Sequence, residues 1–375
     1  MAIAIVLVLI VVGSILFHFL SPWWFTPLAS NWDQMDNTLI ITFVVTGVVF
    51  IGINLFIAYA VFRFRHREGR QAAYEPENKK LEWWLIGLTS VGIAVMLAPG
   101  LIVYAEFVHA PKDASVIEVV GQQWKWSFRF PGKDGVLGSV NPRLISFDNP
   151  FGLNPDDPNG QDDVLVQSGE LHLPLDKPVR VLLRSKDVLH DFYVPHFRVK
   201  MDAVPGVLSG FWFTPTKPGR FDVACAEFCG LGHHTMRSAV IVEENRAFQQ
   251  WLNAQTTFAR SSEQQGGTLS ALAQKGRELA QARGCRGCHS VDGSPGAGPT
   301  WKGLFGKTET LADSSTIVVD EDYLKTSILQ PNAAIVEGYP AIMPPYDLSG
   351  EELDALIEYT KTLQAGAGSE AESSE

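Results

Sequence analysis

Two thiols, a thioether and a pair of histidines fall within the twelve residues CAEFCGLGHHTM, from Cys225 to Met236. Thiolate, thioether and imidazole ligands together suit copper ions. A single copper would use only one of these thiols. Two thiolates on one short loop can instead bridge a pair of copper ions, provided that another imidazole comes from elsewhere in the fold. A disulfide between Cys225 and Cys229 in an exported domain is the alternative interpretation.

A second chemical motif, CRGCH, covers residues 285–289. In this pattern both thiols attach covalently to a haem and the histidine binds its iron. Redox dithiols and zinc sites share the spacing, but no cysteine or histidine follows His289 to complete a zinc shell. Met343, in the segment IMPPY, is the only methionine after His289, and it is either the second axial ligand or an ordinary buried methionine. Histidine and methionine ligation favours a relatively high reduction potential, as suits an electron carrier.

Three apolar runs precede both motifs, at residues 1–20, 38–62 and 83–105. Each is long enough to cross a hydrocarbon core of about 30 Å as a helix. The loop between the second and third runs collects basic residues, which predicts that it is cytoplasmic and that the polar remainder lies outside: Arg63, Arg65, Arg67, Arg70, Lys79 and Lys80. Residues 1–20 lack a basic start, so we expect a retained first helix; a cleaved signal peptide is the alternative.

Many short strand-like stretches follow the third run. They predict a compact antiparallel Greek-key barrel or sandwich, and they lie at 115–130, 164–173, 178–184, 207–213, 219–225 and 238–243. Residues 131–163 are rich in Gly, Pro, Asp and Asn, which indicates a surface loop rather than core. Beyond the strands we expect helices at 246–258, 269–283 and 350–363, a flexible linker at 261–267 and a disordered tail at 365–375.

The net charge of the chain is −11, and the segment from Gly267 to Glu375, with 8 basic and 16 acidic residues, carries most of it. An acidic haem module would attract a basic soluble electron donor, although ordinary solubility explains the charge equally well. All four cysteines belong to the two motifs. None is left for a structural disulfide.

The order of these motifs resembles subunit II of haem-copper cytochrome c oxidase. Two membrane runs flanking a basic loop are followed by GQQWKWSF, VLHDFYVPHFRVKMDAVPG and CAEFCGLGHHTM, and the CRGCH module resembles the caa-type branch, in which a cytochrome c domain is fused to that subunit. The resemblance covers residues 35–364. It implies a multi-domain membrane protein with N-terminal transmembrane helices, a cupredoxin-like Greek-key β-barrel at 112–245, a helix and linker at 246–267, and an all-α cytochrome c domain at 268–364.

The resemblance also implies a dinuclear copper centre, CuA. Its expected ligands are the bridging thiolates of Cys225 and Cys229, the imidazoles of His190 and His233, and, more weakly, Met236 and the backbone carbonyl of Glu227. His196 and His234 are rivals for the imidazole roles. His190 ranks above them because it occupies the family's VLHxxxVP pattern, and His233 because of its offset from Cys229.

Four further roles come from the resemblance alone. The Glu227 carboxylate is expected to reach a magnesium ion at the boundary with subunit I, since a hard cation prefers oxygen ligands. Trp124 matches an exposed aromatic at the electron-input face, and a packed strand aromatic is the alternative. Glu82 matches an acid that leads protons toward a channel in the partner, although an acid at a helix start also complements the helix dipole. Pro299 is expected to orient His289 through its carbonyl oxygen.

The function implied is that of an electron-input subunit. Soluble cytochrome c would reduce haem c, and haem c would reduce the copper centre. The copper centre would pass the electrons to subunit I, which would reduce oxygen to water and pump protons. Further membrane subunits and lipid are expected partners, nucleic acid is not, and the location is a bacterial inner (plasma) membrane with the copper and haem domains on the periplasmic side. Open alternatives are the electron-input subunit of a nitric oxide reductase and a membrane-tethered copper carrier. Quinol-oxidising relatives lack the copper thiols that this sequence retains.

Overall fold

The computed structural model describes residues 2–21, 26–69, 71, 76–146, 149–166, 169–260, 269–291, 293 and 296–363. The chain divides into two compact units, Met1–His109 and Ala110–Glu375. The linker predicted at 261–267 and the tail predicted at 365–375 lie outside the described residues.

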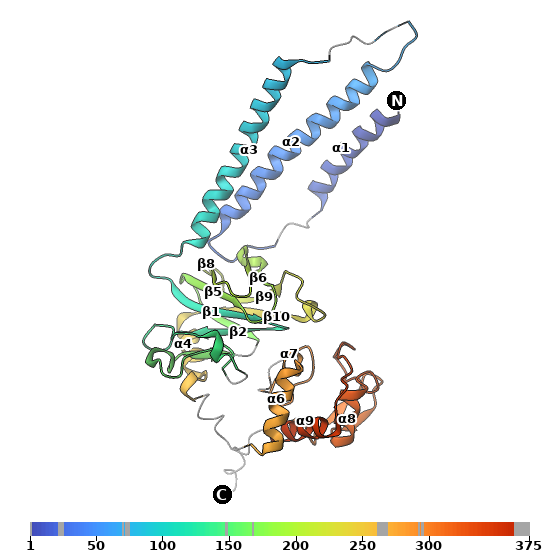
Figure 1. Ribbon diagram of the computed structural model, residues 1–375. Coiled ribbons are helices and arrows are strands. Elements are labelled where there is room, and N and C mark those ends of the chain that lie inside the picture. Colours follow the sequence, from blue (N-terminus) through green and yellow to red (C-terminus); the bar gives the residue numbers. More distant parts are fainter. Residues whose placement is uncertain are drawn as a thin grey trace. The chain divides into compact units, whose positions relative to one another are not determined.

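The first unit contains three long helices: α1 (Ala2–Leu20), α2 (Asp33–Arg63) and α3 (Lys79–Val108). All three are long and apolar enough to cross a membrane, and α2 lies between α1 and α3 (Figure 1). Most of their apolar side chains are exposed, as expected of helices that face lipid or neighbouring helices. Both α2 and α3 extend beyond the predicted apolar runs. The N-cap residue Asn78 explains the early start of α3, because its side chain accepts a hydrogen bond from the Leu81 amide at 3.1 Å.

Two five-stranded sheets form the middle of the chain. The first has the order β3-β2-β1-β5-β8, from β1 (Ser115–Gln122), β2 (Lys125–Phe130), β3 (Val164–Val166), β5 (Val179–Ser185) and β8 (Ser209–Phe213). The second has the order β4-β10-β9-β6-β7, from β4 (Glu170–Pro174), β6 (His190–Val194), β7 (Val199–Ala203), β9 (Gly219–Cys225) and β10 (Arg237–Glu243). Short 3-10 turns lie in the connections between strands: Pro142–Leu144 and Pro158–Gly160 between β2 and β3, Pro195–Phe197 between β6 and β7, and His233–Thr235 between β9 and β10.

This arrangement confirms the β-barrel or sandwich class but differs from the sequence prediction in two ways. The β1/β5 and β4/β10 pairs are parallel, so the sheets are not wholly antiparallel. Strands β6 and β7 were not predicted. In β6 the polar residues His190 and Asp191 occupy buried positions, which hides the alternation of polar and apolar residues by which a strand is recognised.

Aromatic side chains from both sheets fill the space between them. Trp126 of the first sheet contacts Phe192 of the second with ring centroids 5.3 Å apart, and Phe192 lies 6.2 Å from Phe211 of the first. All three are almost completely buried. Each such side chain stabilises the fold by roughly 1.5–3 kcal/mol relative to an exposed one.

The segment 131–163, predicted to be surface loop, contributes to a small core of its own. Phe151 and Leu153 are fully buried and pack with Val120 and Phe258. A buried ion cluster links the end of this segment to the first sheet. The Arg129 guanidinium of β2 pairs with Glu118 of β1 at 2.6 Å and with Asp163, the last residue of the segment, at 2.5 Å. Among its described residues the segment forms loops and 3-10 turns, as predicted, but the expectation that it adds nothing to the core was wrong, because its few apolar residues are scattered among turn residues.

Beyond α4 (Asn245–Ala254), which packs on Phe130 through Phe248 and Trp251, the C-terminal module is mainly helical. It contains α6 (Ala271–Ala282), α7 (Cys285–Cys288), α8 (Glu321–Leu329), α9 (Gly350–Thr362) and one added two-stranded ladder, β11 (Thr308–Thr310) with β12 (Thr316–Val318). Helices α6 and α9 approach closely at Gly276, where a Cβ atom would lie 1.9 Å from the Ala355 carbonyl oxygen. The expected helical class of this module is confirmed.

Candidate metal and haem sites

The loop between β9 and β10 gathers the sulfur residues of the first motif. Cys225 ends β9, Cys229 lies in the loop, and Met236 directly precedes β10. Strand β6 pairs with β9 so that Phe192 lies opposite Cys225, and this register brings His190, at the start of β6, to the same loop. Residues separated by 35 positions in sequence therefore meet at one end of the second sheet.

The side-chain atoms of this cluster lie close to one another. The sulfur atoms of Cys225 and Cys229 are 3.7 Å apart and not bonded. His190 Nδ1 lies 3.9 Å from the Cys225 sulfur, and His233 Nδ1 lies 3.5 Å from the Cys229 sulfur. The Met236 thioether sulfur is 3.8 Å from Cys229.

This donor set fits soft metal ions. His190, Cys225 and Cys229 each direct one ligand atom into a space in which these atoms all lie within 4.8 Å of one another. Since metal–sulfur bonds are about 2.3 Å long, two sulfurs at the observed separation can share a metal ion. His190 and Met236 are fully buried and both cysteines nearly so, which leaves the sulfurs little access to water.

The two thiols ionise differently without metal. Burial disfavours both thiolates, but hydrogen bonds from His190 and from nearby backbone groups outweigh it at Cys225 and lower the pKa of that thiol to about 6. At Cys229, burial and the negative charge of Cys225 together raise the pKa. Binding of copper by both thiolates would therefore release the proton that Cys229 retains.

Asp187, which sequence reasoning did not single out, orients His190. Its carboxylate accepts a hydrogen bond from His190 Nε2 at 2.8 Å and from the Gln123 amide at 2.7 Å. With Nε2 engaged, Nδ1 is left as the nitrogen that faces Cys225. A carboxylate three residues before the histidine was the available signal in the sequence.

Trp124 lies against the metal loop. Its indole Nε1 donates to the Cys229 carbonyl at 3.1 Å, and the Gln123 side-chain amide donates to the same oxygen at 2.8 Å. The side chain is half-buried. These two donors hold the peptide that follows Cys229.

Glu227 presents two groups in different directions. Its backbone carbonyl oxygen lies 3.2 Å from the Cys225 sulfur, whereas its carboxylate lies 3.5 Å from Lys200 Nζ. The rival histidines lie apart from the sulfur pair: His196 packs on Phe221 with ring centroids 5.4 Å apart, and the side chain of His234 is exposed.

Glu82 lies in the first turn of α3, in the other compact unit. Its side chain is exposed, and its backbone amide bonds to the Asn78 carbonyl at 3.0 Å.

The CRGCH motif forms the short helix α7. Cys285 and Cys288, three residues apart, lie on the same side of this helical turn. His289 follows directly and donates its Nδ1 proton to the Pro299 carbonyl oxygen at 2.7 Å. Nε2 is therefore left as the free ring nitrogen, and burial lowers the pKa of His289, which favours the neutral form that binds iron.

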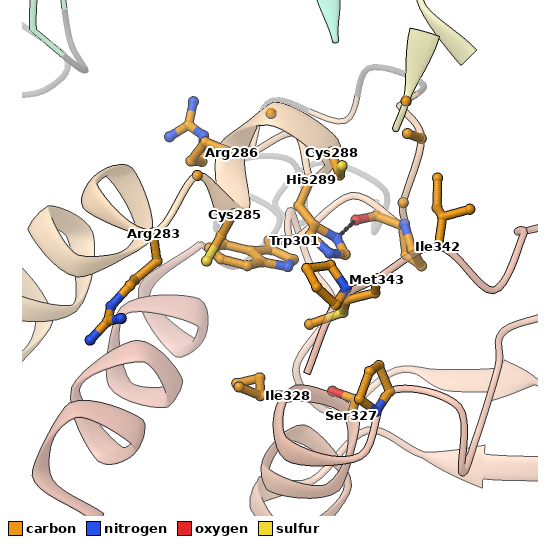
Figure 2. A pocket seen from close by; sticks show the side chains of 18 of the residues that line it. Arg283, Cys285, Arg286, Cys288, His289, Trp301, Ser327, Ile328, Ile342 and Met343 are labelled. Atoms are coloured by element: carbon orange, nitrogen blue, oxygen red, sulfur yellow. Dashed lines mark hydrogen bonds between the residues drawn. The ribbon is translucent and has the colours of Figure 1, made fainter. Parts of the chain in front are cut away.

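A cavity opens beside His289 and contains the other predicted axial residue. Figure 2 shows His289, Trp301 and Met343 along its wall, with Ile328 and Ile342 nearby. Trp301 stacks on the His289 ring, with centroids 5.3 Å apart and planes inclined by 22°. Two thiols, a free imidazole nitrogen and a thioether around one largely apolar cavity fit a covalently attached haem c.

Comparisons with known proteins match the copper region and the haem region of the chain to two different families. The family described as "Cytochrome C oxidase subunit II, periplasmic domain" matches residues 115–244, and the family described as "Cytochrome c" matches residues 273–364. The copper cluster and the haem motif lie within the two matched ranges.

Three similar proteins illustrate the likeness. "Alternative cytochrome c oxidase subunit 2" of Bradyrhizobium diazoefficiens is 61% identical over 259 residues, which cover 69% of this chain and 94% of that protein. "Cytochrome c oxidase subunit 2" of Alkalihalophilus pseudofirmus is 29% identical over 341 residues, covering 89% and 87%. A crystal structure of the periplasmic domain of subunit II from Bradyrhizobium japonicum is 30% identical, with a TM-score of 0.29, and covers 39% of this chain and 95% of that one.

Proposed function

Because the chain belongs to the cytochrome c oxidase subunit 2 family, we propose a specific route by which its residues bring electrons into the oxidase. Family membership confirms several sequence predictions: a subunit of the oxidase complex, an electron-input role, a fused cytochrome c domain and three apolar helices that anchor the chain. The two matched domains imply CuA and haem c as cofactors, and the family implies subunit I as partner.

We assign the copper ligands to six residues of the cupredoxin-like domain. Cys225 and Cys229 would bridge the two ions, His190 and His233 would bind one each, and Met236 and the Glu227 carbonyl would complete the shell. The observation that supports this assignment is the clustering of His190 with both buried thiols. A copper pair bound there supplies one-electron chemistry with little rearrangement, because its unpaired electron is shared.

We assign the haem attachment to Cys285 and Cys288 and the axial ligands to His289 and Met343. A haem held there supplies an electron carrier of relatively high potential. Pro299 fixes the tautomer of His289, because its carbonyl oxygen accepts the hydrogen bond from His289 Nδ1. The chain would accept an electron from soluble cytochrome c at this module and deliver it through the copper loop to subunit I, with Trp124 as a relay beside Cys229.

Three further assignments extend the proposal. The Glu227 carboxylate would share a magnesium ion with residues of subunit I, and Glu82 would lead protons toward the partner's channel. The three helices would span a bacterial inner membrane, with the loop between α2 and α3 inside and both redox modules on the periplasmic side. The basic residues of that loop support this orientation.

The deciding experiment is purification of the full-length chain with its partners from native membranes, followed by metal, haem and subunit analysis. We expect two coppers and one covalent haem in this chain, together with subunit I. The Cys225→Ser and His190→Ala variants should lose the near-infrared absorption and the electron paramagnetic resonance signal of the copper pair, while His196→Ala keeps both. Unchanged spectra in Cys225→Ser would disprove the ligand assignment.

A further inference from the structure

A group of charged side chains lies beside the copper loop on strands β6 and β7. Asp191 and Asp202 are directly opposite each other in this antiparallel pair, and Lys200 lies two residues before Asp202. Residues at this spacing point to the same face of the ladder. The two carboxylates and the ammonium therefore share one face of the β6–β7 pair.

Lys200 connects this face to the metal loop. Its Nζ lies 3.5 Å from the Glu227 carboxylate and 4.0 Å from the Asp191 carboxylate. Glu227 is the residue whose carbonyl oxygen lies 3.2 Å from the Cys225 sulfur. The ammonium is thus one side chain away from the thiolate proposed to bridge the copper pair.

Asp191 is a buried acidic residue whose side chain is only partly satisfied by hydrogen bonds. Its side chain is 1% exposed, and its Oδ1 atom has no hydrogen-bond partner among the described residues. Its backbone carbonyl accepts from the Ala226 amide at 3.2 Å, which ties it to the same loop. Burial of a carboxylate is costly without a compensating charge, and Lys200 provides one.

Building on the copper centre proposed above, we propose that Lys200 sets the reduction potential of that centre by compensating the carboxylates of Glu227, Asp191 and Asp202. A metal centre becomes less positive when it gains an electron, so a nearby cation favours its reduced form and nearby carboxylates favour its oxidised form. Loss of the Lys200 charge leaves the Glu227 carboxylate and the neighbouring Asp191–Asp202 pair beside the loop without their cation. The copper centre then becomes harder to reduce.

The test compares reduction potentials of the copper centre in the full-length, copper-loaded chain. We expect Lys200→Met to shift the electron equilibrium toward the oxidised form by about three- to tenfold, or ~30 to ~60 mV. Lys200→Arg keeps the charge and should match the wild type. Arg220→Met is the matched control, because Arg220 also pairs with two carboxylates, Glu170 at 3.1 Å and Asp222 at 3.6 Å, on the β4 and β9 strands.

Asp202→Asn provides a second measurement of opposite sign, since it removes a negative charge from the same group. Asp202→Asn should raise the reduction potential of the copper centre. If Lys200→Met takes up no copper, the potential of Asp202→Asn alone tests the proposal. The proposal is overturned if Lys200→Met and Asp202→Asn both keep the wild-type potential, or if Arg220→Met lowers it as much as Lys200→Met. A wild-type chain without the copper spectrum would count against the copper centre itself, whereas normal spectra with unchanged potentials would count against Lys200 alone.

Discussion

The Asp187 carboxylate accepts a hydrogen bond from His190 Nε2 at 2.8 Å, and this contact fixes which imidazole nitrogen faces the sulfur pair. Asp187 lies in the connection between β5 and β6, and His190 is the first residue of β6, so the carboxylate and the imidazole that it orients are only three residues apart in sequence. The burial of His190 excludes water as a substitute partner.

Replacing Asp187 by Ala should weaken copper binding by roughly 10–100-fold, the usual effect of losing a carboxylate behind a histidine ligand. Competition with a copper chelator, followed by near-infrared absorption, measures the change. The exposed Asp222 of β9 supplies the control, since Asp222→Ala removes the same group away from the loop and should leave affinity unaltered. Equal affinities in all three proteins would show that Asp187 does not orient the ligand.

Replacing Met343 by Leu should leave the haem covalently attached but lower its reduction potential. The thioether is lost while the volume of the side chain is nearly kept, and axial ligands set haem potentials over a range of about 0.8 V. Redox titration and the charge-transfer band of methionine-bound iron report the change. Met201→Leu, on β7 of the copper domain, should change neither. A wild-type potential in Met343→Leu would exclude Met343 as the ligand.

Replacing Gly298 by Ala should disturb the proximal histidine. A Cβ atom at this position would lie 2.7 Å from His289 Cε1 and 3.0 Å from Nδ1, so the ring must move away from the Pro299 carbonyl. A clash of this kind costs about 1–3 kcal/mol. The haem spectrum and the thermal stability of the module should both change, while Gly350→Ala, where nothing lies within 4 Å, serves as control.

Replacing Arg129 by Leu should destabilise the copper domain by about 3–5 kcal/mol, because Asp163 would remain buried without its cation and Glu118 would keep only Arg184 as an ionic partner. Denaturant unfolding of the full chain, followed through the copper absorption, measures the loss. Arg220→Leu removes an exposed ion pair and should cost at most about 1 kcal/mol. Comparable midpoints for the two variants would contradict a stabilising role for the buried cluster.

Asp163 should also make stability depend on pH. Burial raises the pKa of this carboxyl to about 6 despite the attraction of Arg129. A raised pKa means that the folded state binds the proton more tightly, so this contribution to stability is complete below about pH 4 and is lost as pH rises through 6. Relative to Asp163→Asn, the wild type should lose up to about 3 kcal/mol between pH 4 and pH 7. Parallel stability curves for the two proteins would contradict the shift.

The sequence alone was sufficient for the two redox motifs, the apolar helices and the family. CAEFCGLGHHTM and CRGCH are local patterns, since their ligands are separated by a few residues and lie on one loop or one helical turn whatever surrounds them. Membrane helices are similarly evident, because continuous apolar runs need no tertiary information to be recognised.

Only the tertiary structure decided which distant groups meet these motifs. The pairing of β6 with β9 brings His190 to the cysteines, Asp187 orients its ring, and the edge strand β7 carries Lys200 to Glu227. Strand register determines these contacts, and register depends on packing across the whole sheet. Trp301 likewise reaches His289 only through the fold of the haem module. A sequence names the atoms that can bind metal, but the pairing of strands and the packing of helices determine the charges and hydrogen bonds around them.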